Sequence, residues 1–95
     1  MFLHVTKAKH VEGYKVEVSF NNGQTGIADL STVLKGPVFA PLRELEAFAQ
    51  FHVDEELATI VWPNGADLAP EYLYFIAFKT RPDLQSQFRR WGYIA

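Results

Sequence analysis

Two carboxylates stand where a helix is expected to open, and their type and spacing make them the first candidates for chemistry. Asp67 and Glu71 lie four residues apart and flank Pro70, a residue that fits the first turn of a helix. The positive end of the helix dipole and its free N–H groups would hold both side chains ionised. A general acid–base pair instead needs a carboxyl group that keeps its proton near neutral pH. The placement favours helix capping, with a partner contact and an active-site role as alternatives.

Other residue types that carry chemistry form no pattern. His4, His10 and His52 are far apart and lack the i, i+4 spacing of metal ligands on a helix. The serines lie in no nucleophile-elbow context, and the glycines make no phosphate-binding loop. The sequence has no cysteine, which removes thiolate catalysis, disulfides and Cys-based zinc sites. We therefore expect no catalytic residue, no metal, no cofactor and no enzyme activity.

The stretch around the two carboxylates is rich in aromatic side chains. These residues could form the core or could frame a small-ligand pocket near Trp62 or a protein interface, since aromatics are common interface anchors. Asn64 and Gly65 suit a tight turn better than a ligand contact. The candidate interaction residues of this stretch are Trp62, Asn64, Gly65, Asp67, Glu71, Tyr72 and Tyr74.

A second candidate surface lies near the end of the chain. It mixes basic and aromatic residues, as single-stranded nucleic-acid sites do. Four cationic side chains in a protein of net charge −2 provide little positive charge for binding nucleic acid. The preferred interpretation is therefore a tail helix that docks on its own domain or on a second copy. The residues of this set are Phe88, Arg89, Arg90 and Trp91.

Charge is segregated along the chain. Between Glu44 and Phe78 there are seven carboxylates and no lysine or arginine, whereas the segment from Lys79 onward is mainly basic. The two regions could be ordinary solvated faces, or they could steer association within or between molecules.

Length and composition fit one soluble domain spanning residues 1–95. The chain is 48% hydrophobic and 15% aromatic, which favours a folded globule over disorder. No window reaches the ~18 apolar residues of a membrane span, and the N-terminus lacks the pattern of a secretion signal. We expect a cytoplasmic protein without membrane contact.

Several short strands are expected in the part of the sequence that precedes Asp67 and Glu71. Alternating apolar and polar residues, the period of a half-buried strand, are clearest at residues 14–20. The Asn22-Gly23 pair suits a type I′ turn, which would set Val18 opposite Ile27. Strands are expected at residues 2–8, 14–20, 24–28, 51–53 and 57–62. The last is apolar on both faces and is therefore expected to be covered on both sides.

Helices are expected between and after these strands. Asp29 could cap a helical turn at residues 30–34, which Gly36-Pro37 would end. A helix from Pro41 would place Leu42, Leu45, Phe48 and Ala49 on one apolar stripe. Two more are expected at residues 70–78 and, beyond a break at Arg81-Pro82, 84–91. The order predicts an α+β domain, with a small antiparallel sheet of two hairpins packed against helices and a helical tail at about residues 79–95.

The run Trp62-Pro63-Asn64-Gly65-Ala66-Asp67-Leu68, continued by Ala69-Pro70-Glu71-Tyr72-Leu73-Tyr74, resembles a signature of a bacterial family classed as a domain of unknown function. The resemblance covers about residues 5–75, together with Asp29-Leu30, Gly36-Pro37-Val38-Phe39 and Pro41-Leu42-Arg43. Some members of that family carry an added helix-turn-helix domain, and others are encoded in toxin–antitoxin-like pairs. The resemblance implies an α+β fold and a bacterial cytoplasmic setting, and no catalytic residues. The residues after Phe78 are too few for a helix-turn-helix domain.

These observations lead to a functional hypothesis. We expect a non-enzymatic protein-interaction module, a homodimer that acts as the regulatory or antitoxin-like partner of another small bacterial protein. The alternatives are a nucleic-acid-linked regulator that uses the basic aromatic tail and a small-ligand-binding domain near Trp62.

Overall fold

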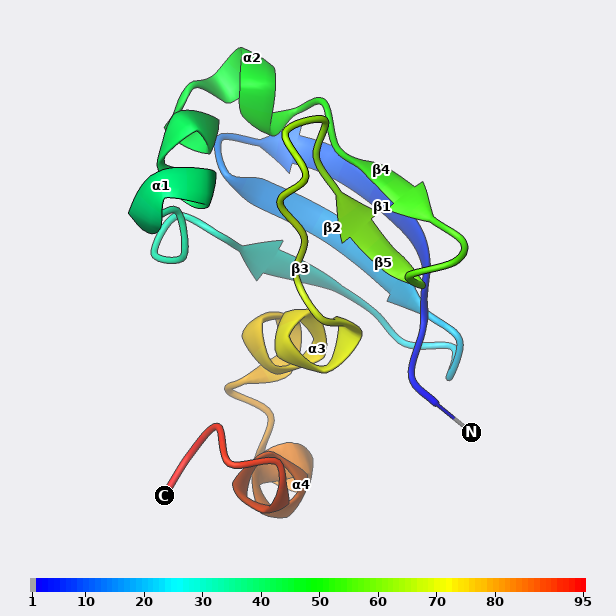
Figure 1. The fold of residues 1–95 in the computed structure, drawn as a ribbon. Coiled ribbons are helices and arrows are strands. Elements are labelled where there is room, and N and C mark those ends of the chain that lie inside the picture. Colours follow the sequence, from blue (N-terminus) through cyan, green and yellow to red (C-terminus); the bar gives the residue numbers. More distant parts are fainter. Residues whose placement is uncertain (1) are drawn as a thin grey trace.

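The computed structural model describes residues 2–95, in which strands precede a helical end (Figure 1). Three antiparallel strands form one sheet in the order β1-β2-β3, and two more form a separate hairpin. The α+β class with a helical C-terminal end is confirmed. The strands are β1 (Val5–Glu12), β2 (Lys15–Phe20), β3 (Thr25–Asp29), β4 (His52–Asp54) and β5 (Thr59–Val61).

Strand β2 supplies the centre of the core. Val16, Val18 and Phe20 are buried, while Lys15 and Glu17 at alternate positions are exposed. This alternation follows from the period of two along a strand that covers a core with one face only. The half-buried strand predicted at residues 14–20 is confirmed.

The register of the β2–β3 hairpin corrects the sequence prediction. Its loop has three residues, because the Gly23 N–H donates to the Phe20 carbonyl at 3.0 Å and the Phe20 N–H donates to the Gln24 carbonyl at 2.9 Å. Val18 consequently faces Gly26, not Ile27. A shift of one residue moves every side chain of a strand to the other face, and Ile27 is accordingly 43% exposed.

Packing explains this register. A Cβ atom on Gly26 would lie 2.6 Å from Phe78 Cε1, so only glycine lets the helix that carries Phe78 approach the inner face of β3 this closely. The predicted register would place Ile27 on this face instead. The two-residue type I′ turn was therefore the wrong choice between two turns that both suit Asn-Gly.

The middle of the chain is less helical than predicted. Asp29 accepts a hydrogen bond from the Ser31 N–H at 3.0 Å, but it opens a turn and not a helix. Gly36-Pro37 begins a helix instead of ending one, as proline near a first turn allows. The segments are α1 (Gly36–Phe39), a 3₁₀ turn η1 (Ala40–Arg43) and α2 (Leu45–Phe48).

The single stripe expected from Pro41 onward is also wrong. Glu44 is extended, with φ −74° and ψ 120°, so the helical period is interrupted there. Leu42 and Phe48 are buried, whereas Leu45 is 47% exposed. A break of this kind rotates the residues that follow it away from the stripe that an unbroken helix would form.

The second hairpin closes the other side of the core. Thr59 and Ile60 are adjacent and both buried, which confirms that β5 is covered on both faces there. Thr59 meets its hydrogen-bonding need by donating its hydroxyl to the Leu68 carbonyl. Leu57, expected in the same strand, is 53% exposed and precedes it.

The helical end matches the sequence prediction closely. It contains α3 (Pro70–Phe78), a 3₁₀ turn η2 (Pro82–Leu84) and α4 (Gln85–Arg90). Gly92, at φ +84°, ends α4, and the Tyr93 N–H returns to the Phe88 carbonyl at 3.0 Å, the pattern of a glycine-terminated helix. Figure 1 shows α3 beside the strands and α4 beyond it. Within residues 2–95, no helix has the length and apolar character to cross a membrane.

Candidate functional site

The turn after β5 uses its own residues for structure. The Gly65 N–H donates to the Trp62 carbonyl and the Trp62 N–H donates to the Ala66 carbonyl, each at 2.9 Å. Asn64 accepts from the Ala66 N–H through Oδ1 at 3.1 Å and donates through Nδ2 to the Val38 carbonyl at 2.9 Å. The prediction that Asn64 and Gly65 form a tight turn is confirmed.

Trp62 belongs to the core. Its side chain is 1% exposed, and the indole N–H donates to the Phe48 carbonyl at 2.7 Å. The ring also packs against Phe39, Phe48 and Phe51. Tyr74, another candidate, is 4% exposed, so these two members of the predicted interaction set lie mainly inside the molecule.

The capping role predicted for Asp67 is wrong. The residue at the N-cap of α3 is Ala69, whose side chain cannot accept a hydrogen bond. Asp67 lies two residues earlier, exposed, and forms an isolated bridge with Val61. Extended backbone up to Ala69 delays the helix, so only Glu71 lies in the first turn, where the helix dipole favours a carboxylate.

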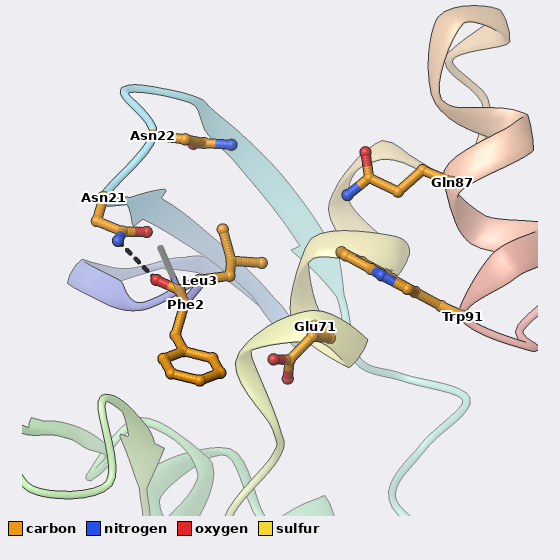
Figure 2. Close-up of a pocket in the computed structure, with 7 residues that line it drawn as sticks. All are labelled: Phe2, Leu3, Asn21, Asn22, Glu71, Gln87 and Trp91. Atoms are coloured by element: carbon orange, nitrogen blue, oxygen red, sulfur yellow. Dashed lines mark hydrogen bonds between the residues drawn. The ribbon is translucent and has the colours of Figure 1, made fainter.

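Glu71 lines a cleft of about 360 Å³ at the helical end (Figure 2), which is larger than a second pocket described below. One wall comes from the N-terminal segment and the β2–β3 loop, and the other from α3 and α4. Trp91, Gln87 and Glu71 extend from the helices toward the first wall. The lining residues are Phe2, Leu3, Asn21, Asn22, Glu71, Gln87 and Trp91.

Hydrogen bonds hold the first wall in place. Asn21 accepts from the His4 N–H through Oδ1 and donates through Nδ2 to the Phe2 carbonyl, each at 2.8 Å. Asn22 accepts from the Gln24 N–H and donates to the Tyr74 hydroxyl at 3.3 Å. The loop is therefore tied both to the N-terminal segment and to α3, which fixes the width of the cleft.

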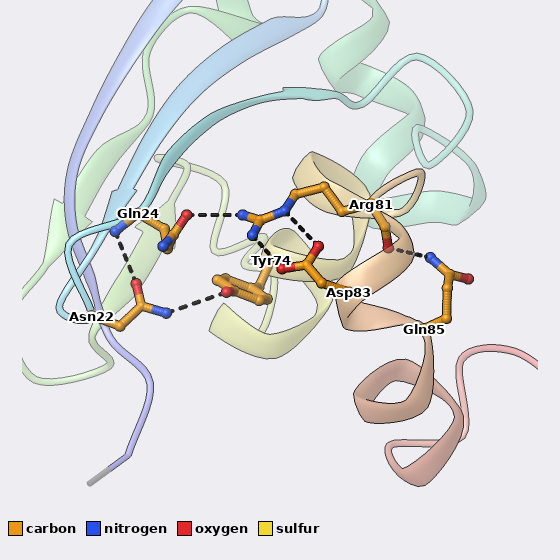
Figure 3. A network of polar contacts seen from close by, with 6 residues as sticks. All are labelled: Asn22, Gln24, Tyr74, Arg81, Asp83 and Gln85. Atoms are coloured by element: carbon orange, nitrogen blue, oxygen red, sulfur yellow. Dashed lines mark hydrogen bonds and ion pairs between the residues drawn. The ribbon is translucent and has the colours of Figure 1, made fainter.

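Arg81 makes a second connection between the hairpin and the helices (Figure 3). Its guanidinium donates to Gln24 Oε1 at 2.9 Å and to Asp83 Oδ2 at 2.6 Å. The hydrogen bond from Arg81 holds the pKa of Asp83 below its usual value. Gln85 donates to the Arg81 carbonyl at 2.8 Å, so the segment between α3 and α4 is braced against the β2–β3 loop.

An aromatic cluster docks α4 on α3. Phe88 is fully buried and meets Phe75 edge-to-face at 5.1 Å between ring centroids. Tyr93 stacks on Phe75 at the same separation. Burial raises the pKa of Tyr93, and the charge of Glu71 adds to this rise. The expectation that a tail helix docks on its own domain is met by these contacts.

Comparison with known families identifies the chain. The sequence profile of a family described as "Protein of unknown function (DUF2442)" matches residues 5–79. The chain belongs to the DUF2442 family. The matched region includes Asn21, Asn22 and Glu71, whereas Phe2, Leu3, Gln87 and Trp91 lie outside it, so flanking segments complete the cleft around the DUF2442 region.

A solved structure shares the fold of this DUF2442 protein. It is named "Putative DNA Binding Protein NE0471 from Nitrosomonas europaea ATCC 19718", with a TM-score of 0.75 and 19% identity over 99% of this chain. The chain spans 63% of that protein's length. At this identity the likeness concerns the fold alone. The search of curated proteins gave no match.

The four candidate residues predicted in the tail of this DUF2442 protein lie in different environments. Phe88 is buried, and Arg89 donates through Nε to the Ala95 carbonyl at 2.9 Å. Arg90 is exposed, and Trp91 is half-buried at the cleft. Of the two sets of candidates, Glu71 from one and Trp91 from the other meet at one site.

Sequence reasoning missed most of the cleft. Phe2, Leu3 and Gln87 carried no motif, and the Asn21-Asn22 pair was interpreted as a turn only. Their juxtaposition depends on contacts between the two ends of the chain, for which a single sequence holds no signal. The change from an acidic to a basic segment after Phe78 was the one sequence feature that distinguished the tail from the preceding residues.

A smaller pocket of about 230 Å³ lies beside the Trp62 turn. Its walls are mainly apolar, and Trp62 is buried in the core and is not among the described residues that line the pocket. A ligand of the predicted Trp62 site would therefore meet Pro63 and Asn64 instead of the indole ring. The lining residues are Pro41, Leu42, Ala47, Gln50, Pro63 and Asn64.

The larger cleft offers groups that can bind a polar or cationic ligand. The described residues of its lining provide one carboxylate, three side-chain amides and two aromatic rings. Carboxylate and amide oxygens accept hydrogen bonds, and aromatic faces attract cations. Among residues 2–95, no group of three His, Asp or Glu side chains is placed to hold a metal ion.

Proposed function

We propose that this protein is a non-enzymatic interaction module that regulates another small protein, as an antitoxin regulates its partner. The observation that carries the proposal is the open cleft at which Glu71 and Trp91 meet. Half-buried aromatic side chains beside polar groups are typical of the anchors of protein interfaces. The proposal includes a homodimer as the working form and, consistent with a chain free of cysteine, a cytoplasmic setting.

Charge supports a protein partner over an anionic one at this cleft. Among the lining residues that the structure describes, Glu71 is the only charged one, and it belongs to a stretch of carboxylates without lysine or arginine. Opposite charge on a partner would steer its approach and fix its orientation. The negative charge at the cleft therefore favours a positively charged segment of a small protein as the occupant.

The test compares matched variants in a capture experiment. Tagged wild-type protein, Glu71→Arg and the control Glu46→Arg are used as baits in extracts of the source cells, with bound proteins quantified by mass spectrometry. Glu46 is exposed on α2, away from the cleft. We expect a stoichiometric small protein with wild type and Glu46→Arg that is lost with Glu71→Arg. An identical set of bound proteins for all three baits would contradict the proposal.

Self-association is measured separately by light scattering on the purified chain. A mass of two chains supports the homodimer, and a single-chain mass at all concentrations overturns it. Deletion of residues 82–95 would be a poor test, because it removes Phe88 and uncovers Tyr74 and Phe75. Point substitutions at the surface avoid this loss of core.

Nucleic-acid binding is the second candidate, favoured by the exposed Lys79 and Arg90 and by the name of the structural neighbour. Phe88 is buried and unavailable for base stacking, and Arg81 and Arg89 already make internal hydrogen bonds. Such binding would rest on phosphate contacts and fall steeply with salt. Fluorescence anisotropy with labelled DNA at low and high salt tests this. Salt-sensitive binding lost in Arg89→Ala/Arg90→Ala would support it.

A further inference from the structure

We infer that the cleft between the N-terminal segment and α3–α4 binds a guanidinium group, the head of an arginine side chain on the partner protein. The inference deepens the proposed function and rests on it for the identity of the partner. It concerns the chemistry of the cleft itself, which can be measured without any partner.

The first argument is an available carboxylate. Glu71 is half-buried in the cleft wall. Within residues 2–95 the ion pairs join Lys15 to Glu12 and Arg81 to Asp83, and neither includes Glu71. A carboxylate that is partly withdrawn from water and faces no cation gains from a charge-assisted hydrogen bond when a cation arrives.

The second argument is a pair of aromatic walls. Trp91 is held by edge-to-face contacts with Tyr74 and Tyr93, at 6.1 and 6.2 Å between ring centroids. Phe2 lies on the opposite wall and is 84% exposed. A flat guanidinium stacks on aromatic faces and is less strongly hydrated than an ammonium group. The geometry therefore suits arginine better than lysine.

The third argument concerns hydrogen-bond acceptors. A guanidinium has five N–H donors in one plane, more than a single carboxylate can accept. Figure 2 shows the Gln87 amide extending from α4 toward the same gap that Glu71 borders. The Gln87 amide oxygen is therefore a further acceptor in the lining beside the Glu71 carboxylate, and a planar guanidinium can use such an acceptor while one face lies on an aromatic ring.

Other occupants fit less well. An apolar side chain would remove Glu71 from water without giving its charge a partner, which is costly. A phosphate or a carboxylate would face the same negative charge. The volume of about 360 Å³ falls within the range of roughly 300–1,000 Å³ seen for ligand pockets. One arginine side chain and part of its backbone is the occupant that volume and charge both favour.

The test is an NMR titration of the isotope-labelled full chain with Nα-acetyl-arginine amide. We expect saturable shifts at the Trp91 indole N–H, the Gln87 side-chain amide and the backbone around Glu71, with a Kd on the order of 1–10 mM, the weak end of the affinity scale. Nα-acetyl-citrulline amide, nearly the same shape without the charge, should give no saturable shift. Nα-acetyl-lysine amide should bind at least threefold more weakly than the arginine probe.

Matched variants complete the experiment. Glu71→Gln should weaken arginine-probe binding at least fivefold, while Glu46→Gln on exposed α2 should not change it. Spectra of both variants report whether the fold is intact. Equal binding of the arginine and citrulline probes, equal binding of the arginine and lysine probes, or unchanged binding in a folded Glu71→Gln variant would each overturn the inference. A silent titration beside partner capture that depends on Glu71 would reject the arginine site and keep the proposed function.

Discussion

At the scale of single residues, Gly26 controls how closely α3 approaches the sheet. An added Cβ would lie 2.6 Å from Phe78 Cε1 and 2.9 Å from its Cζ. We expect Gly26→Ala to lower the free energy of unfolding by about 1–3 kcal/mol, the usual cost of overpacking. Urea denaturation followed by circular dichroism measures this change.

A double-mutant cycle separates this clash from any intrinsic effect of alanine. Phe78→Leu removes the ring atoms nearest to Gly26 but destabilises the core on its own. In the double variant the cost of Gly26→Ala should largely disappear, because the two residues are in direct contact. Simple addition of the two single costs would contradict the close-approach explanation.

At the scale of elements, the chain uses the same loop twice. Asn21-Asn22-Gly23 and Pro63-Asn64-Gly65 each close a turn with glycine at positive φ, +86° and +88°. We expect Gly23→Ala and Gly65→Ala each to cost about 1–2 kcal/mol, since this conformation crowds a Cβ. Gly65→Asn is the control, because asparagine tolerates this conformation. Equal costs for alanine and asparagine in urea denaturation would show that φ is not the cause.

The docking of α4 depends on one buried ring. Phe88 is fully buried against Tyr74, Phe75 and Trp91. We expect Phe88→Ala to release α4 while the sheet stays folded, so that amide protons of residues 85–90 lose protection and those of β2 keep it. Hydrogen exchange by NMR measures this difference. Ser86→Ala, on the exposed side of α4, is the control, and equal loss in β2 and α4 would show one cooperative unit.

At the scale of the whole molecule, Asp29 and Tyr93 make stability depend on pH at opposite ends of the scale. Hydrogen bonds from Ser31 hold the pKa of Asp29 below its ordinary value of 3.8. Its contribution is present above that value and is lost as the pH falls through the native pKa. Burial raises the pKa of Tyr93 above its ordinary 10.0. That contribution is present below pH 10 and is lost as the pH rises through the native pKa.

Two conservative substitutions test these contributions. Asp29→Asn keeps an oxygen that can accept from the Ser31 N–H but does not titrate, so we expect a shallower loss of stability in acid. Tyr93→Phe keeps the stacked ring without the hydroxyl, so we expect a shallower loss in alkali. Unfolding free energies measured across pH give both slopes. Slopes parallel to those of wild type would contradict the two assignments.

The sequence by itself determined what local chemistry can specify. The period of two indicated the buried face of β2. Pro70 marked the start of α3, Pro82 the break between α3 and α4, and Gly92 the end of α4. The family resemblance pointed to a domain of unknown function, which the match over residues 5–79 confirms. The α+β class and the presence of a tight turn after β5 could be predicted because they depend on residues close together in the chain.

Only the tertiary structure decided the rest. The Asn21-Asn22-Gly23 loop could close with two or three residues, and the approach of Phe78 to Gly26 selected three. Asp67 met the local rules for a cap, yet extended backbone up to Ala69 carried it away from the helix. The cleft joins Leu3 to Trp91 across nearly the whole chain. Contacts between such distant residues arise from packing of the complete core, and no local pattern in the sequence encodes them.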